Sequence, residues 1–475
     1  MRRFFLFAVG LVVAISLGCS SLIFPATVAA KSSDPCVGIL GKADKLYVRR
    51  QLEQAEKLYR QCKPEFADEE DTSAFFPKAI TDPSELSVSG QRFWKNAQDG
   101  IEQNLEIKTN VSLKLLTERY PEFIPAHLLR AKLLKDSEGN EETYLETLER
   151  TASLFPHDAD IAKMRVEALR DAGERLDASI AARLFSIVNE KHPQASEFQK
   201  MADEDLRKFR SGIKAQYIGK TAASFLCTLF CPGGGSTIQK ATESVRMAQL
   251  VFEGESKLGS RLAGERLNKG DLVEDPVITK YVDKIGQDMA RLMGRDEFTY
   301  EFYVVNNPSL NASAYPGGKV FINTGAITAA RTEAELAGII GHEVAHAVLS
   351  HGYQKVSNAR FLNSLTKVSP LKGFSRYLGL ATSAMSRKQE KDCDILATRA
   401  LVGYGYAADG LHNLFTNLTK ISGSRPPAYL SSHPVPETRL KYLRALIKQN
   451  GYNRYAYEGV QEHDKIKQRL KELGT

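Results

Sequence analysis

The run from His342 to His346, with the sequence His-Glu-Val-Ala-His, combines residue types that bind a metal ion and move a proton. Its two histidines are four residues apart, so on a helix both imidazoles project from one face and can reach one ion. Glu343 follows the first histidine and can take the proton from a water molecule held at the metal. The spacing therefore predicts hydrolytic chemistry at a zinc ion.

The residues before this run predict the helix that must carry it. Thr332 is followed three residues later by Glu335, which is the pattern of a capping box, and an apolar stretch continues to Gly341. His351 lies nine residues after His342 and is interpreted as a cap or packing residue at the helix end. A surface helix that carries two unrelated histidines is the alternative.

A zinc site needs a third protein ligand, and the sequence offers one further along the chain. A third histidine ten residues after the first is absent, because Gly352 stands there. Glu390 and Asp394 share one face of a helix-forming stretch that opens at Ser386. Glu390 suits the third ligand, and Asp394 suits the acceptor that orients a ligand imidazole. A solvated, charged helix face is the alternative.

A loop-forming segment contributes two more candidates. His433 stands before Pro434, and Arg439 follows five residues later. A histidine in such a loop can donate a hydrogen bond to a developing oxyanion, or it can bind the metal as a fourth ligand and keep the site latent. Arg439 can pair with an acidic side chain. Both roles of His433 remain open at this point.

These motifs, in this order, resemble the gluzincin zinc metallopeptidases of the CAAX prenyl protease and HtpX type. A soluble periplasmic branch of that family includes the β-barrel assembly-enhancing protease. The resemblance covers roughly residues 250–450 and includes Asn311–Gly325 before the first ligand helix. It implies an α+β zincin-like domain, mostly helical with a small sheet, with one Zn²⁺ per chain and polypeptide substrates.

The resemblance also assigns roles to individual residues. It implies His342, His346 and Glu390 as metal ligands and Glu343 and His433 as catalytic residues. Asp394 and Arg439 would support the ligands from behind. The segment Asn311, Ala312 and Ser313 would bind substrate, although relatives usually carry an aromatic residue where Ser313 stands.

Two β-rich runs flank this last segment. Thr299–Val305 and Lys319–Asn323 are predicted strands, and a turn at Pro316-Gly317-Gly318 precedes the second. A strand at the edge of a cleft can hydrogen-bond an extended polypeptide with little demand on its sequence. An ordinary hairpin in a small sheet is the alternative.

The amino-terminal half predicts a different, all-α module. Pro121, Pro156 and Pro193 recur 35 and 37 residues apart, and helix-forming segments lie between them. This period favours tetratricopeptide-like repeats, with a plain helical bundle as the alternative. We expect a repeat-like module at 31–212, a connecting segment at 213–249, the metallopeptidase domain at 250–450 and a helical tail at 451–475.

The first 30 residues predict an export signal, because Arg2 and Arg3 precede an apolar run. Cleavage after Ala30, lipidation at Cys19 and retention as an uncleaved anchor are the three outcomes, and we expect the protein in the periplasm or another extracytoplasmic compartment. No later segment has the length of a transmembrane helix. The net charge of +7 over 475 residues is mild and does not indicate nucleic acid.

The cysteines fit an oxidising compartment. Disulfides are expected between Cys36 and Cys62 and between Cys227 and Cys231, whereas Cys393 is expected to be buried and free. The segment 358–385 mixes apolar and basic residues, which predicts either a lid over the cleft or contact with a membrane surface.

The favoured function is a zinc-dependent endopeptidase that degrades misfolded or misassembled envelope proteins. In this interpretation the helical repeats recruit substrates or the envelope assembly machinery. The rival is a periplasmic chaperone or adaptor that uses the repeats, with its peptidase activity latent or suppressed.

Overall fold

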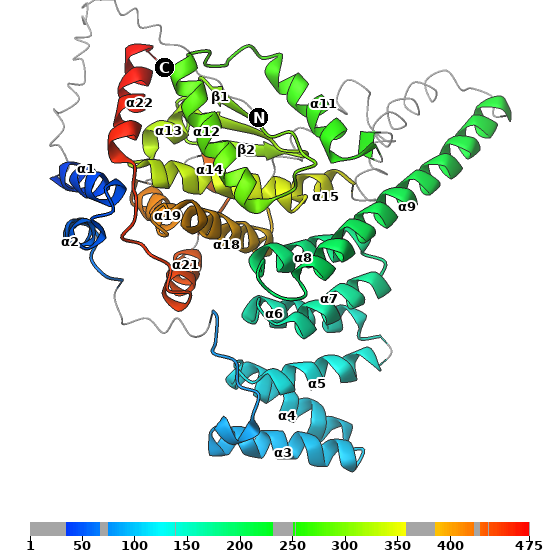
Figure 1. Cartoon of the computed structure of the whole chain (residues 1–475). Coiled ribbons are helices and arrows are strands. Elements are labelled where there is room, and N and C mark those ends of the chain that lie inside the picture. The colour runs from blue at the N-terminus through cyan, green and yellow to red at the C-terminus, as the bar shows by residue number, and fades with distance from the viewer. Residues whose placement is uncertain are drawn as a thin grey trace, which may run out of the picture.

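The computed structural model describes residues 35–66, 75–137, 139–230, 250–251, 253–357, 385–421, 428–435 and 437–474. Over these residues the chain is mostly helical and contains one small three-stranded sheet (Figure 1). The amino-terminal helices are α1 (Pro35–Val48), α2 (Leu52–Cys62), the 3-10 turn η1 (Pro83–Glu85), α3 (Val88–Glu102), α4 (Glu106–Arg119), α5 (Ile124–Lys135), α6 (Glu141–Leu154), α7 (Ala159–Asp171), α8 (Arg175–Val188) and α9 (Ala195–Phe230).

The remaining elements carry the sheet and the residues predicted to form the site. They are α11 (Glu255–Leu267), α12 (Pro276–Met293), β1 (Glu301–Val305), β2 (Ala312–Tyr315), β3 (Lys319–Asn323), α13 (Thr324–Ala329), α14 (Glu333–Val348), α15 (His351–Ser357), α18 (Arg387–Tyr404), α19 (Gly410–Ile421), α20 (Ala428–Ser432), α21 (Glu437–Gln449) and α22 (Val460–Glu472).

Helices α3 to α9 form a stack in which each helix packs on the next (Figure 1). Pro121, Pro156 and Pro193 each lie in a turn, between α4 and α5, α6 and α7, and α8 and α9. Proline suits these turns because it cannot continue the preceding helix. Small apolar clusters hold neighbouring helices together, as Phe185 and Phe198 do between α8 and α9. The assignment of the stack as tetratricopeptide-like repeats stays a prediction.

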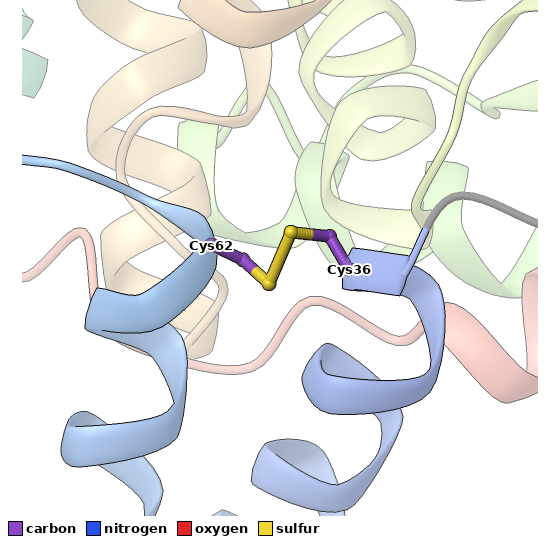
Figure 2. The surroundings of a disulfide bond; sticks show 2 residues. All are labelled: Cys36 and Cys62. Carbon is purple, nitrogen blue, oxygen red and sulfur yellow. A yellow bond between two sulfur atoms is a disulfide. The ribbon is translucent and has the colours of Figure 1, made fainter.

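The hairpin α1–α2 lies apart from α3 and packs against α22 (Figure 1). A disulfide joins Cys36 and Cys62 across the open end of this hairpin (Figure 2). Asp44 on α1 accepts hydrogen bonds from the backbone N–H groups of Glu458 and Val460, at 2.9 and 3.0 Å. The sequence interpretation grouped this hairpin with the repeat-like module, whereas these contacts attach it to the carboxy-terminal region.

The sheet has the strand order β1-β3-β2, with β1 parallel and β2 antiparallel to β3. Helices α12 and α14 pack against it and belong to one large apolar core. The turn Pro316-Gly317-Gly318 reverses the chain between β2 and β3. A side chain at Gly317 would meet the backbone of Ser256 on α11 at 2.6 Å, and its φ of +73° also favours glycine.

Among the described residues, none of the helices combines the length and apolar composition needed to cross a membrane. Several sequence predictions fall outside the described part of the chain. These are the export signal at 1–30 with Cys19, the pair formed by the Cys227 side chain and Cys231, and nearly all of the proposed lid at 358–384.

Candidate active site

Helix α14 begins where the sequence indicates and places both histidines in the core. Thr332 Oγ accepts the backbone N–H of Glu335 at 3.1 Å, which is one half of a capping box. The Glu335 carboxylate accepts the backbone N–H of Arg331 at 2.9 Å instead of that of Thr332. Every residue of α14 is buried, because the sheet, α12, α18 and α19 surround it.

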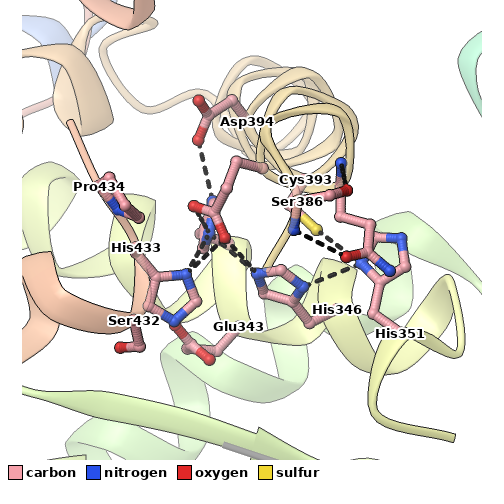
Figure 3. A network of polar contacts seen from close by, with 12 residues as sticks. Glu343, His346, His351, Ser386, Cys393, Asp394, Ser432, His433 and Pro434 are labelled. Carbon is pink, nitrogen blue, oxygen red and sulfur yellow. Dashed lines mark hydrogen bonds and ion pairs between the residues drawn. The ribbon is translucent and has the colours of Figure 1, made fainter. Parts of the chain in front are cut away.

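Helix α18 carries the acidic pair and starts at a complete capping box. Gln389 N donates to Ser386 Oγ at 3.2 Å, and Ser386 N donates to Gln389 Oε1 at 3.0 Å. Because the cap fixes the first turn, it also fixes the position of Glu390, the next residue. Helices α14 and α18 pack along each other, so Glu390 and Asp394 face His342 on α14. Asp394, His346 and His433 are labelled in Figure 3.

Three potential donor groups converge between these helices. The Nε2 atoms of His342 and His346 are 3.1 Å apart. Glu390 Oε2 lies 3.4 Å from His342 Nε2, and Glu390 Oε1 lies 3.5 Å from His346 Nε2. All three side chains are buried.

This donor set fits zinc. In a tetrahedral zinc site with Zn–N bonds of about 2.0–2.1 Å, neighbouring donor atoms are roughly 3.3 Å apart. The spacings of 3.1, 3.4 and 3.5 Å between the three groups lie close to that value. Two imidazoles and one carboxylate are also a usual set for a catalytic zinc ion, which keeps its fourth position for water or substrate.

His433, from the turn after α20, lies where a fourth donor would be. Its Nδ1 is 2.8 Å from Glu390 Oε1 and 3.4 Å from His342 Nε2 (Figure 3). The ring stacks on Tyr429 with centroids 4.5 Å apart. His433 Nε2 is 3.5 Å from Glu343 Oε1, and that oxygen is buried without a hydrogen-bond partner in the described structure.

Asp394 and Arg439 contact the candidate ligands His342 and Glu390 from behind. Asp394 Oδ1 lies 2.9 Å from His342 Nδ1, which fixes the tautomer that leaves Nε2 free to bind a metal. Arg439 donates from Nε and Nη2 to the Asp394 carboxylate at 2.6 and 2.7 Å, and its Nη1 is 2.7 Å from Glu390 Oε2. The Tyr442 hydroxyl also donates to Asp394.

His351 plays a part that the sequence interpretation missed. Its Nδ1 is 2.9 Å from His346 Nδ1, so the two rings share a hydrogen bond on the side of His346 that faces away from Glu390. Cys393, buried and free, places its sulfur 3.5 Å from the same His351 nitrogen. The signal in the sequence was a histidine five residues after a ligand, just past the helix end, where the chain can fold back onto it.

The charge state of the site's side chains follows from their burial and from their short distances to one another. Burial by itself would raise the pKa of Glu390, but contacts from His342, His346 and His433 hold it well below its usual range. Burial lowers the pKa of His346 to about 4. Burial also opposes protonation of His342, yet hydrogen bonds to Asp394 and Glu390 raise its pKa to about 9. The negative charge of the Glu390 and Asp394 carboxylates therefore favours binding of a divalent cation.

The segment proposed to bind substrate leads into the edge strand of the sheet. Ala312 and Ser313 on β2 pair with Ile322 and Phe321 of β3. Asn311 precedes the strand, and its Oδ1 is buried without a hydrogen-bond partner in the described structure. Leu310 accepts the backbone N–H of Tyr429 at 3.1 Å, which ties this segment to the helix before His433.

Fold and site together define a metallopeptidase of the gluzincin class, in which one helix supplies two histidines and a second helix supplies a glutamate. Residues 276–447 match peptidase family M48, so this part of the chain is a peptidase M48 domain. It is 26% identical over 216 residues to the beta-barrel assembly-enhancing protease of Yersinia pestis, which covers 42% of this chain and 44% of the relative. The Escherichia coli K12 protein of the same name is 23% identical over 209 residues, or 40% of this chain and 43% of the relative.

A mitochondrial relative has the same kind of match. The mitochondrial metalloendopeptidase OMA1 of Arabidopsis thaliana is 26% identical over 263 residues, which cover 54% of this chain and 52% of the relative. The matches therefore span about half, or somewhat less, of the length of these curated relatives. The names of the relatives support a metalloendopeptidase.

Proposed function

We propose that this protein is a zinc-dependent endopeptidase of the cell envelope that degrades misfolded or misassembled proteins. The observation that carries this proposal is the near-tetrahedral spacing of His342, His346 and Glu390, with Glu343 Oε1 close by, buried and without a hydrogen bond. The disulfide between Cys36 and Cys62 supports an oxidising compartment outside the cytoplasm. We include in this proposal that the substrates are misfolded or misassembled envelope proteins and that the envelope assembly machinery is a partner.

The chemistry assigns a role to each side chain. When bound by the three ligands, zinc supplies a Lewis acid that polarises water and the scissile carbonyl. Glu343 accepts the proton of the attacking water and returns it to the leaving amine nitrogen. Asp394 and Arg439 keep His342 and Glu390 oriented throughout. The β2 edge can hold the substrate as an extended strand, which makes few demands on its sequence.

Replacement of Glu343 by Gln tests this function. The variant keeps the size of the side chain and the metal ligands but removes the base. We expect it to retain zinc by elemental analysis and to cleave reduced, carboxymethylated α-lactalbumin at least 100-fold more slowly than the unaltered protein. Glu472→Gln, an exposed change on α22, is the matched control. Equal cleavage by the Glu343→Gln variant and the unaltered protein would refute the assignment as a hydrolase that uses Glu343.

The position of His433 favours a second candidate, in which peptidase activity is suppressed and the protein acts as a chaperone or adaptor. His433 Nδ1 contacts both Glu390 and His342, so in this arrangement it stands in the place needed by water or substrate. His433→Ala separates the two roles of this residue. If His433 blocks the site, its removal raises the cleavage rate. If it stabilises the oxyanion, its removal lowers the rate by roughly 100-fold or more.

A further inference from the structure

Helix α18 has a second face that the hydrolytic site does not use. Glu390 and Asp394 point toward the histidines of α14. Lys388, Asp392 and Ile395 lie on the other side of α18 and line a cavity of about 540 Å³ between α18 and helices α6 to α8. The helix that supplies a metal ligand is therefore also one wall of a separate cavity.

This cavity continues into a second one of about 390 Å³. Phe155, Pro156, Val188 and Ile395 line both, so the two adjoin and form one groove along α18. From Lys388 to Arg399 the groove follows 11 residues of helix, or about 16 Å. An extended polypeptide of about five residues has that length.

The walls of the larger cavity combine apolar surface with charged side chains of both signs. Arg165 on α7 and Asp392 on α18 both line it, and each is only 8% exposed. Among the described residues, neither side chain forms a hydrogen bond or an ion pair. Asp392 interacts electrostatically with Arg165 and Lys388 across the wall, but without a direct hydrogen bond both Asp392 and Arg165 keep donor and acceptor capacity that a polar ligand could use.

The sign of the charge indicates what that ligand carries. The lining contains four basic and three acidic residues, which leaves one positive charge in excess: Arg150, Arg165, Lys388 and Lys391 against Glu146, Glu149 and Asp392. Lys388 has a partner in Glu149 at 3.4 Å, and Lys391 donates to Ser153 Oγ at 2.7 Å. Arg165 is thus the cation most in need of a carboxylate.

We propose that this groove binds an extended segment of a client polypeptide in which an acidic side chain lies between apolar ones. The acidic side chain pairs with Arg165, Asp392 accepts a backbone N–H of the segment, and the apolar side chains contact Val188 and Ile395. The inference rests on the proposed function in taking a polypeptide as the occupant. It adds a recruitment site on the side of α18 away from the metal ligands.

Peptide binding to the Glu343→Gln protein tests the inference without interference from cleavage. The probe is a fluorescein-labelled, carboxy-terminally amidated peptide, Ser-Ala-Leu-Glu-Val-Ala-Ser, followed by fluorescence anisotropy. We expect the same peptide with Gln in place of Glu to bind roughly tenfold to 100-fold more weakly. Arg165→Gln should weaken binding of the Glu peptide by a similar factor and leave the Gln peptide nearly unaffected, because one contact is removed in both cases.

Controls keep each outcome decisive. Arg207→Gln, the same charge change at an exposed position on α9, should leave the affinity unchanged. If circular dichroism shows that Arg165→Gln does not fold, Ala162→Leu replaces it, since a larger side chain on this wall narrows the groove and should weaken binding of both peptides.

Three results would overturn the inference. They are equal affinity for the two peptides, binding that is indifferent to Arg165 and Ala162, and a dimer that dissociates on Arg165→Gln without peptide binding. The last result would assign the groove to a second copy of the chain. A protein that binds the peptide but cleaves nothing would keep the groove and lose the proposed hydrolase, so the two failures can be told apart.

Discussion

Replacement of Asp394 by Asn tests the support of the metal ligands with the smallest change in shape. The amide has the size of the carboxylate but carries no charge, and its NH2 group presents two N–H donors in place of an acceptor oxygen. In the structure both Asp394 oxygens are engaged, Oδ1 by His342 Nδ1 at 2.9 Å and Oδ2 by Arg439 Nε at 2.6 Å. The substitution therefore weakens the control of the His342 tautomer and leaves Arg439 with Glu390 as its charged partner.

The two effects have different magnitudes. Loss of an outer partner of a metal ligand typically lowers metal affinity about 10-fold to 100-fold, which corresponds to about 1.4–2.8 kcal/mol. Removal of one partner of a buried ion pair destabilises a fold by about 3–5 kcal/mol. Because Arg439 Nη1 stays 2.7 Å from Glu390, we expect the lower end of that range, about 3 kcal/mol.

Two measurements separate the effects. Competition with a fluorescent zinc chelator gives the metal affinity, and urea unfolding of the chelated protein gives the stability of the metal-free fold. Asp171→Asn is the matched control, because that side chain is 69% exposed and its contact with Lys135 is long, at 3.7 Å. A folded Asp394→Asn protein whose zinc affinity stays within threefold of the original would refute the role assigned to Asp394.

Three further predictions follow from buried polar groups. His351→Ala should lower zinc affinity about 10-fold, because His346 Nδ1 loses its partner at 2.9 Å. Competition with the zinc chelator measures this affinity. An unchanged affinity would show that His351 only packs against the helix end. Burial lowers the pKa of His127 to about 4, whereas the unfolded chain has its usual value of about 6.5. Between these two values the unfolded chain binds the proton more tightly than the folded one, so the protein loses stability as pH falls from 6.5 toward 4. Between pH 7 and pH 5 the free energy of unfolding, measured with urea, should therefore fall about 2 kcal/mol less in His127→Gln than in the unaltered protein. Equal falls in the two proteins would contradict this prediction. Lys63→Met should destabilise the fold by about 3–5 kcal/mol in the same assay, since Lys63 Nζ lies 2.5 Å from both Asp409 and Glu458, and a change below about 1 kcal/mol would count against it.

The residues that could bind a metal were readable from the sequence because helical geometry is local. The spacing of His342 and His346, and that of Glu390 and Asp394, puts each pair on one face of its own helix wherever that helix lies. Thr332 and Ser386 likewise mark the helix starts, since an N-cap depends only on the next few residues. The sequence thus determined which side chains are candidate metal ligands and which two helices carry them.

Only the tertiary structure decided how these local pieces meet. Packing of α14 against α18 sets the 3.4 Å approach of Glu390 to His342, and the chain reversal after α14 brings His351 back onto His346. The attachment of the α1–α2 hairpin to α22 and the groove behind α18 also depend on contacts between segments hundreds of residues apart. Such contacts arise from burial of shared surface, which sequence periodicity does not encode, because it shows which face of a helix is apolar but not what covers it.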